Sequence, residues 1–191
     1  MSFVWFNEPK KWSSNASAIN VHTDRETDFW RKTHNGCERD NGHFYYRSLP
    51  GERDFTATVN IRGKYHTRYD QGGLMIRIDE KNWIKCGVEY VDGKQFASVV
   101  TTVNGWSDWS VVPINSPDVL KLSVKREKEA IYINYAEGEQ GEFRMMRLSY
   151  FPEIDKEQNL LVGVMCASPS KETEGFEIIF EGFNIVENDA K

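Results

Sequence analysis

Two basic residues, one carboxylate and two tryptophans follow one another at strand-like spacing in the middle of the chain. They are Arg77, Trp83, Lys85, Glu89 and Trp109. Four strand residues separate Lys85 from Glu89 by about 13 Å, so each needs a partner from a neighbouring strand or from a ligand. Flat indole rings can cover the C–H face of a sugar while a few fixed polar groups orient its hydroxyls. This combination predicts a binding surface for a carbohydrate or a sugar-like metabolite.

Alternating apolar and polar residues predict the elements that carry these side chains. Residues 55–61, 74–78 and 120–124 alternate with period two, as half-buried strands do. No stretch of ten or more residues carries a helical stripe, and about a dozen short strands in one chain are typical of an all-β fold. We therefore expect an antiparallel β-sandwich or jelly roll with little or no helix. Further strands are expected over residues 83–91, 95–103, 130–135, 142–151, 160–167 and 176–186.

Turn sequences and apolar faces together predict the register of four successive strands. Asp92-Gly93 and Asn104-Gly105 favour two-residue hairpins, and matching apolar faces places Ile76 opposite Ile84. Lys85 then lies opposite Val100, which in turn lies opposite Trp109. One face of this meander carries Arg77, Trp83, Lys85, Glu89, Ser98, Thr102 and Trp109. The other face, with Cys86 on it, is predicted to face the core.

Composition limits the classes of function. The chain has 191 residues and a formal net charge of -5, which fits one domain over residues 1–191. Scattered lysines and arginines argue against a nucleic-acid partner, and no apolar run approaches the ~18 residues of a membrane span. The first residues carry no secretory signal, and Cys37, Cys86 and Cys166 form no disulfide or metal motif. We expect a cytoplasmic protein with reduced thiols, no cofactor and no metal site.

A run of alternate carboxylates offers a different chemistry. Glu153-Ile154-Asp155-Lys156-Glu157 is similar to the Glu-x-Asp-x-Glu core of concanavalin-like β-glucanases. A retaining glycosidase needs two carboxyl groups about 5–5.5 Å apart. Pro152 precedes the run, however, and Lys156 occupies a position that should be apolar and face the core. These neighbours predict an exposed connection between two strands.

Short motifs in a fixed order span nearly the whole chain. They are Thr27-Asp28-Phe29-Trp30, Gln71-Gly72-Gly73-Leu74-Met75-Ile76-Arg77, Trp83-Ile84-Lys85-Cys86-Gly87-Val88-Glu89, Ser98-Val99-Val100-Thr101, Ser107-Asp108-Trp109-Ser110, Leu161-Val162-Gly163-Val164, Ala167-Ser168-Pro169 and the closing strand 176–183. In these motifs the chain resembles a regulation-of-enolase-type domain family of otherwise unknown function, within the concanavalin A-like lectin/glucanase superfamily. The resemblance implies two stacked antiparallel sheets with a concave face, where members of the superfamily often bind carbohydrate.

The first of these motifs has two interpretations. Asp28 and Trp30 could lie at the rim of the concave site and add to its ligand-binding residues. Alternatively, Asp28 could accept a hydrogen bond within its own turn while Phe29 or Trp30 closes one end of the sandwich.

Three functions remain open from the sequence. The first is a non-catalytic module that binds a carbohydrate or sugar-like metabolite, and the second is a protein-interaction regulator of a cytoplasmic metabolic enzyme. The third is an enzyme acting on a small sugar derivative, with Glu89 as acid/base and with Lys85 and Arg77 stabilising charge. A dense pocket around a desolvated Glu89 would favour the enzyme. An open groove lined by Trp83 and Trp109 would favour a glycan binder, and a flat apolar patch would favour a protein partner.

Overall fold

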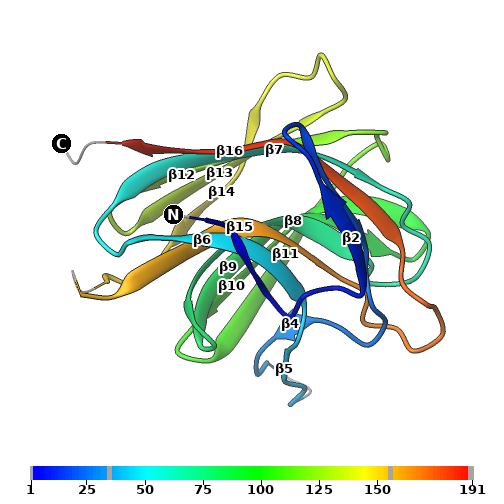
Figure 1. The fold of residues 1–191 in the computed structure, drawn as a ribbon, viewed down its shortest axis with the longest axis horizontal. Helices are drawn as coiled ribbons and strands as arrows, with labels where there is room; N and C mark the ends of the chain where they lie inside the picture. The colour runs from blue at the N-terminus through cyan, green and yellow to red at the C-terminus, as the bar shows by residue number, and fades with distance from the viewer. Residues whose placement is uncertain (1, 34–35, 155–156, 189–191) are drawn as a thin grey trace.

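Two seven-stranded antiparallel sheets stack face to face (Figure 1). The computed structural model describes residues 2–33, 36–154 and 157–188, and these contain sixteen strands and no helix. The first sheet has the order β1 (Val4–Phe6), β6 (His43–Pro50), β15 (Asn159–Ala167), β8 (Gln71–Asp79), β9 (Asn82–Val91), β10 (Lys94–Val103) and β11 (Trp106–Pro113). The second has the order β14 (Arg144–Tyr150), β13 (Ala130–Glu137), β12 (Leu120–Glu127), β7 (Asp54–Gly63), β16 (Glu177–Asn188), β3 (Ala18–His22) and β2 (Lys11–Ser14). The predicted all-β sandwich is confirmed.

The predicted register of the central meander is confirmed pair by pair. Ile76 lies opposite Ile84 on β8 and β9, and Lys85 lies opposite Val100 on β10. Val100 in turn lies opposite Trp109 on β11. Cys86 is buried in the core between the sheets, and Lys85 is on the other face of the same strand. The alternation and the turn residues were therefore sufficient to place every side chain of this meander on its correct face.

A pair of facing glycines lets two of these strands approach closely. Gly73 on β8 pairs with Gly87 on β9. A Cβ atom built on Gly73 would lie 1.8 Å from the carbonyl oxygen of Cys86, and one on Gly87 would lie 2.1 Å from that of Gly72. Both positions belong to the outward face, between Lys85 and Glu89. A side chain at either position would push the strands apart beneath the predicted site.

A short two-stranded ribbon covers part of the outward face of the first sheet. It consists of β4 (Phe29–Trp30) and β5 (Arg39–Asp40), which lie below β9 and β10 in Figure 1, on the side away from the second sheet. Under it lies a second apolar cluster, separate from the main core. Its buried members are Phe29, Phe44, Met75, Trp83, Val100 and Met165. The sequence predicted neither this ribbon nor the strands β1, β2, β3 and β6.

The carboxylate run lies in the connection between β14 and β15, as predicted. Glu153 and Glu157 are exposed and belong to no strand. Asp155 and Lys156 lie outside the described residues. In the part of the chain that the structure describes, no helix is long and apolar enough to cross a membrane.

Candidate ligand-binding cavity over the first sheet

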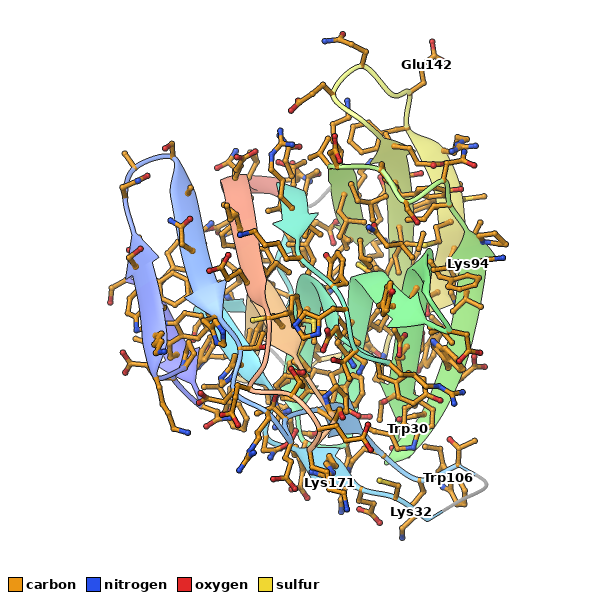
Figure 2. All side chains as sticks on the ribbon, turned by 90° about the vertical axis from the view of Figure 1, so that its right-hand side faces the viewer. Trp30, Lys32, Lys94, Trp106, Glu142 and Lys171 are labelled. Atoms are coloured by element: carbon orange, nitrogen blue, oxygen red, sulfur yellow. The ribbon has the colours of Figure 1, made fainter. Side chains whose placement is uncertain are left out.

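The ribbon presents different side chains to its two faces. Phe29 pairs with Asp40, and both point toward the first sheet, where Phe29 joins the apolar cluster and Asp40 binds an arginine of β8. Trp30 and Arg39 have the opposite orientation and, together with Asp28, line a cavity of about 650 Å³. Figure 2 shows Trp30 at the same end of the molecule as Trp106, with Glu142 at the other end and Lys94 between them. The two-residue period of a strand therefore gives the ribbon one structural face and one face for the cavity.

The half of the outward face under the ribbon is sealed; we call it the sealed half. Arg77 donates to both carboxylate oxygens of Asp40, at 2.5 and 2.8 Å, and its guanidinium lies over the ring of Phe6. Trp83 is 0% exposed, packs against Phe29 and donates its indole N–H to the carbonyl of Glu80. The prediction that Trp83 belongs to the ligand-binding surface is therefore wrong, because a segment more than 40 residues earlier in the sequence covers this side chain.

The other half of the face opens into the cavity; we call it the open half. Lys85 and Glu89 lie in its wall, although both side chains are almost fully buried. The ammonium group of Lys85 donates to Gln71 Oε1 at 2.5 Å, to the carbonyl of Phe29 at 2.6 Å and to Asp28 Oδ1 at 3.2 Å. These three bonds use all three of its protons. Lys85 therefore holds the ribbon on the sheet as well as lining the cavity.

Glu89 has a different environment. Its Oε2 accepts hydrogen bonds from Ser98 Oγ at 2.7 Å and from the indole N–H of Trp109 at 2.8 Å. Burial raises the pKa of Glu89, and the nearby charge of Lys85 opposes this rise only in part. Both bonds go to one oxygen, which leaves Oε1 as the atom that can meet a ligand. The side chain is 8% exposed and lies in the wall of the cavity.

Two aromatic rings form the outer wall beside Glu89. Trp109 is 40% exposed, and the ring of Tyr69 meets it edge-on with 6.3 Å between the ring centroids. Tyr69 has a φ of 71°, a left-handed conformation that is uncommon for a bulky residue. Its amide donates to the carbonyl of Tyr90, and its carbonyl accepts from Gln71. A strained backbone thus fixes an aromatic side chain at the mouth of a cavity, a place where such strain is often functional.

The structure brings five of the nine predicted ligand-binding residues to the cavity. They are Asp28, Trp30, Lys85, Glu89 and Trp109. Ser98 supports Glu89 from behind, whereas Arg77 and Trp83 belong to the sealed half. Thr102 is fully buried and is hydrogen-bonded to Ser107. Asp28 lies in the wall of the cavity, and its Oδ1 accepts hydrogen bonds from Lys85 and from the amide of Phe29 in its own turn.

Nine further residues line the cavity, and among them Arg39, Tyr69 and Gln71 bear most directly on binding. Arg39 and Tyr69 lie in segments with no alternation to place them. Gln71 could have been found, because extending the predicted register of β8 and β9 by five pairs from Ile76 and Ile84 places it opposite Glu89. In the part of the chain that the structure describes, no group of three or more His, Cys, Asp or Glu side chains could hold a metal ion.

Comparison with known proteins identifies the family. Residues 5–188 match the model of a protein family described as a protein of unknown function, DUF1349. The chain belongs to the DUF1349 family. A relative named Regulation of enolase protein 1, from Saccharomyces cerevisiae, is 37% identical over 184 residues, covering 95% of this chain and 88% of the relative. The resemblance proposed from the sequence motifs is therefore confirmed.

Solved structures agree with this assignment. This DUF1349 chain is similar to a crystal structure described as a functionally unknown protein from Saccharomyces cerevisiae. The TM-score is 0.87 with 35% identity, and the match covers 98% of this chain and 97% of that one. A carbohydrate binding module, CBM66 from Bacillus subtilis, matches with a TM-score of 0.56 and 16% identity over 96% of this chain and 95% of the module. At this identity the likeness to the module shows the β-sandwich fold alone.

Proposed function

We propose that the protein binds a small carbohydrate or sugar-like metabolite in the cavity over the open half. The observation that carries the proposal is the placement of the buried Glu89 carboxyl beneath the exposed ring of Trp109, in one cavity of about 650 Å³. Small-molecule sites combine apolar walls with a few placed polar groups in volumes of about 300–1,000 Å³. Trp109 and Tyr69 supply ring surface for C–H groups, and Glu89 Oε1 supplies a partner for a hydroxyl.

The shape of the cavity favours a small ligand over a long glycan chain. A groove lined by Trp83 and Trp109 would have suited an oligosaccharide, but Trp83 lies under the ribbon. The carbohydrate binding module among the structural neighbours is consistent with sugar binding on this fold. The support from this chain's own residues is stronger, because burial of a carboxyl group that lacks a direct ionic partner is costly and is common at functional sites.

The experiment compares two tryptophans of the same strand. Trp109→Ala should lower the affinity for a sugar by about tenfold or more, because it removes both the ring surface and a hydrogen bond to Glu89. Trp106→Ala is the matched control, since Trp106 is 62% exposed and does not line the cavity. Titration calorimetry and intrinsic fluorescence with a panel of monosaccharides and disaccharides measure both. Equal losses in the two variants, or no binding by the unmodified protein, would contradict the proposal.

Catalysis on the bound sugar is a second candidate, supported by the raised pKa of Glu89. A raised pKa brings a carboxyl group closer to the range in which it can act as a general acid. Arg77 is removed from this role by its pairing with Asp40, and the protons of Lys85 are already shared among three acceptors. The substrate panel distinguishes the two functions. Product formation that is lost in Glu89→Gln while binding remains would favour the enzyme.

A regulatory role is the alternative that the relative's name supports. That protein is named for the regulation of enolase, and a ligand-binding domain can act on a partner enzyme. Enolase assayed with and without the purified protein tests this role directly. A change in enolase activity that requires the sugar would join the two functions, and no change in any condition would leave ligand binding alone.

A further inference from the structure

One arginine in the wall of the cavity lacks an acidic partner. Arg39 lies on β5 opposite Trp30 and points with it into the cavity. Its Nη1 donates to the backbone carbonyl of Glu26 at 2.9 Å. A guanidinium has five N–H donors in a planar fork. Most of the donors of Arg39 are therefore available to a molecule in the cavity.

This situation is unusual among the arginines of the protein. Within the described ranges, only Arg39 and Arg126 form no ion pair with a carboxylate. Arg126 is buried and donates to three backbone carbonyls, those of Gly51, Arg53 and Lys128. The guanidinium of Arg126 therefore has a structural role within the fold. Arg39 is the arginine whose charge the fold leaves without a partner, and it is the one that lines the cavity.

The other charged groups in the wall do not cancel this charge. Lys85 and Asp28 form an ion pair, and Asp108 pairs with Arg147. Glu89 holds its proton more strongly than an exposed carboxyl group, because burial raises its pKa. Lys85 and Asp28 match each other in charge, as do Arg147 and Asp108, and the raised pKa of Glu89 favours its uncharged form, so the unpaired guanidinium of Arg39 gives the cavity a positive character. An anionic group on the ligand would complement it.

We propose that the ligand is an acidic sugar, a monosaccharide that carries a carboxylate or a phosphate, and that Arg39 binds its anion in a bidentate manner. This inference rests on the proposed function, because it names the class of sugar that the same cavity takes. Trp30, beside Arg39 on the ribbon, and Trp109, across the cavity on β11, enclose the ring of the sugar. Glu89 meets a hydroxyl, and the planar fork of Arg39 meets the acid.

The test uses matched sugars in sets of three. Titration calorimetry at pH 7 measures the binding of glucose, glucuronate and glucose 6-phosphate, and of the corresponding galactose and mannose sets, to the full chain. We expect at least one acidic sugar to bind 10-fold or more tightly than its neutral parent, with weaker binding as salt increases. Arg39→Gln should lower the affinity for that acidic sugar by about 10- to 100-fold and leave the neutral parent within about twofold.

Two further variants complete the design. Arg25→Gln makes the same change of charge on a neighbouring loop, where the arginine pairs with Glu174 outside the cavity, and should leave binding unchanged. Arg39→Lys keeps the charge but loses the fork, and an intermediate affinity is expected. It also serves if Arg39→Gln does not fold.

The outcomes separate this inference from the function on which it rests. Neutral sugars that bind as tightly as their acids would overturn the acidic-sugar inference and leave sugar binding in place. No binding of any member would overturn both. An equal loss of affinity for acidic and neutral sugars in Arg39→Gln would overturn the proposed direct contact between Arg39 and the acidic group. Preference for the uronate or for the phosphate identifies which acid the arginine binds.

Discussion

The sealed half and the open half of the first sheet carry the same kinds of residue but differ in role. Residues of the sealed half hold the ribbon on the sheet, whereas residues of the open half line the cavity. In the sealed half Trp83 lies on β9, the strand that also carries Lys85 and Glu89 of the open half, and Arg77 lies opposite Trp83 on β8. The charge of Arg77 is matched by both oxygens of Asp40, and Trp83 has no exposed surface. Glu89 binds only neutral donors and faces a cavity. The role of a polar residue on this face is therefore decided by whether the ribbon covers it.

The difference also shows how a flat sheet face becomes a cavity. The ribbon is tied to β8 through Asp40, to β9 through Asp28 and Phe29, and to β11 through bonds of residues 31–33 with Ser107. These three attachments fix one wall over a rigid floor. The sealed half supplies the anchor, and the open half keeps polar groups that a ligand can use.

The largest expected effect on stability comes from truncating Trp83, the buried tryptophan of the sealed half. Trp83→Ala leaves a cavity among Phe29, Met75 and Val100, and we expect a loss of about 3–5 kcal/mol in the free energy of unfolding. Urea denaturation measures it. Trp106→Ala, on the exposed end of β11, should change stability by less than about 0.5 kcal/mol. Similar costs for the two variants would show that the ribbon does not seal Trp83.

A smaller change in stability, this time an increase, is expected when Glu89 in the open half is replaced. Unfolding lets Glu89 ionise with an ordinary pKa, whereas the folded protein raises that pKa through burial. The folded state therefore holds more protons above pH 4.5, and stability falls as the pH rises through the folded pKa. Glu89→Gln keeps an acceptor for Ser98 and Trp109 without this cost. The variant should gain about 1.4 kcal/mol at pH 8 for each unit by which burial raises the pKa.

Thermal denaturation at pH 5 and pH 8 checks this prediction. The gain of Glu89→Gln over the unmodified protein should be larger at pH 8. Glu157→Gln, in the exposed connection before β15, is the control and should show no such difference. A variant that is less stable at pH 8 would mean that the carboxylate form of Glu89 is the one that the fold supports.

How much of this was predictable depends on the distance between partners in the sequence. The β8–β11 meander was predictable because each strand meets the next across a short turn, and Asp92 and Asn104 both adopt the positive φ that their turns require. The ribbon was not, because two-residue strands have no alternation to detect. Asp40 lies 37 residues before Arg77, and no local pattern pairs them. The polar face was thus correctly assembled from the sequence, but its division into two halves was not.

The smallest expected effect concerns the chain segment that leads into the ribbon. His43, at the start of β6, bonds through Nδ1 to the carbonyl of Asn7 and accepts through Nε2 from the amide of Asp24. Burial lowers the pKa of His43. Protonation of His43 therefore favours the unfolded chain. The contribution of neutral His43 to the free energy of unfolding is complete above pH 6.5 and is lost as the pH falls from 6.5 through the folded pKa.

Urea midpoints at pH 7.5 and pH 5.5 measure this loss, which we expect to be on the order of 1 kcal/mol. His43→Gln should reduce the difference between the two pH values, whereas His66→Gln, at an exposed position, should preserve it. An unchanged difference in His43→Gln would assign the pH dependence to other groups.

The attachment of the ribbon has a consequence for the order of folding. Its bond from Asp28 to Lys85 joins residues 57 positions apart, whereas the hairpins of β9–β11 close over two-residue turns. Closing long loops costs more entropy before any contact is gained, so we expect the meander to form first and the ribbon to dock late. Contacts absent from the transition state change the rate of unfolding more than the rate of folding. A molecule bound between ribbon and sheet would therefore lengthen the lifetime of the native protein without helping it to form.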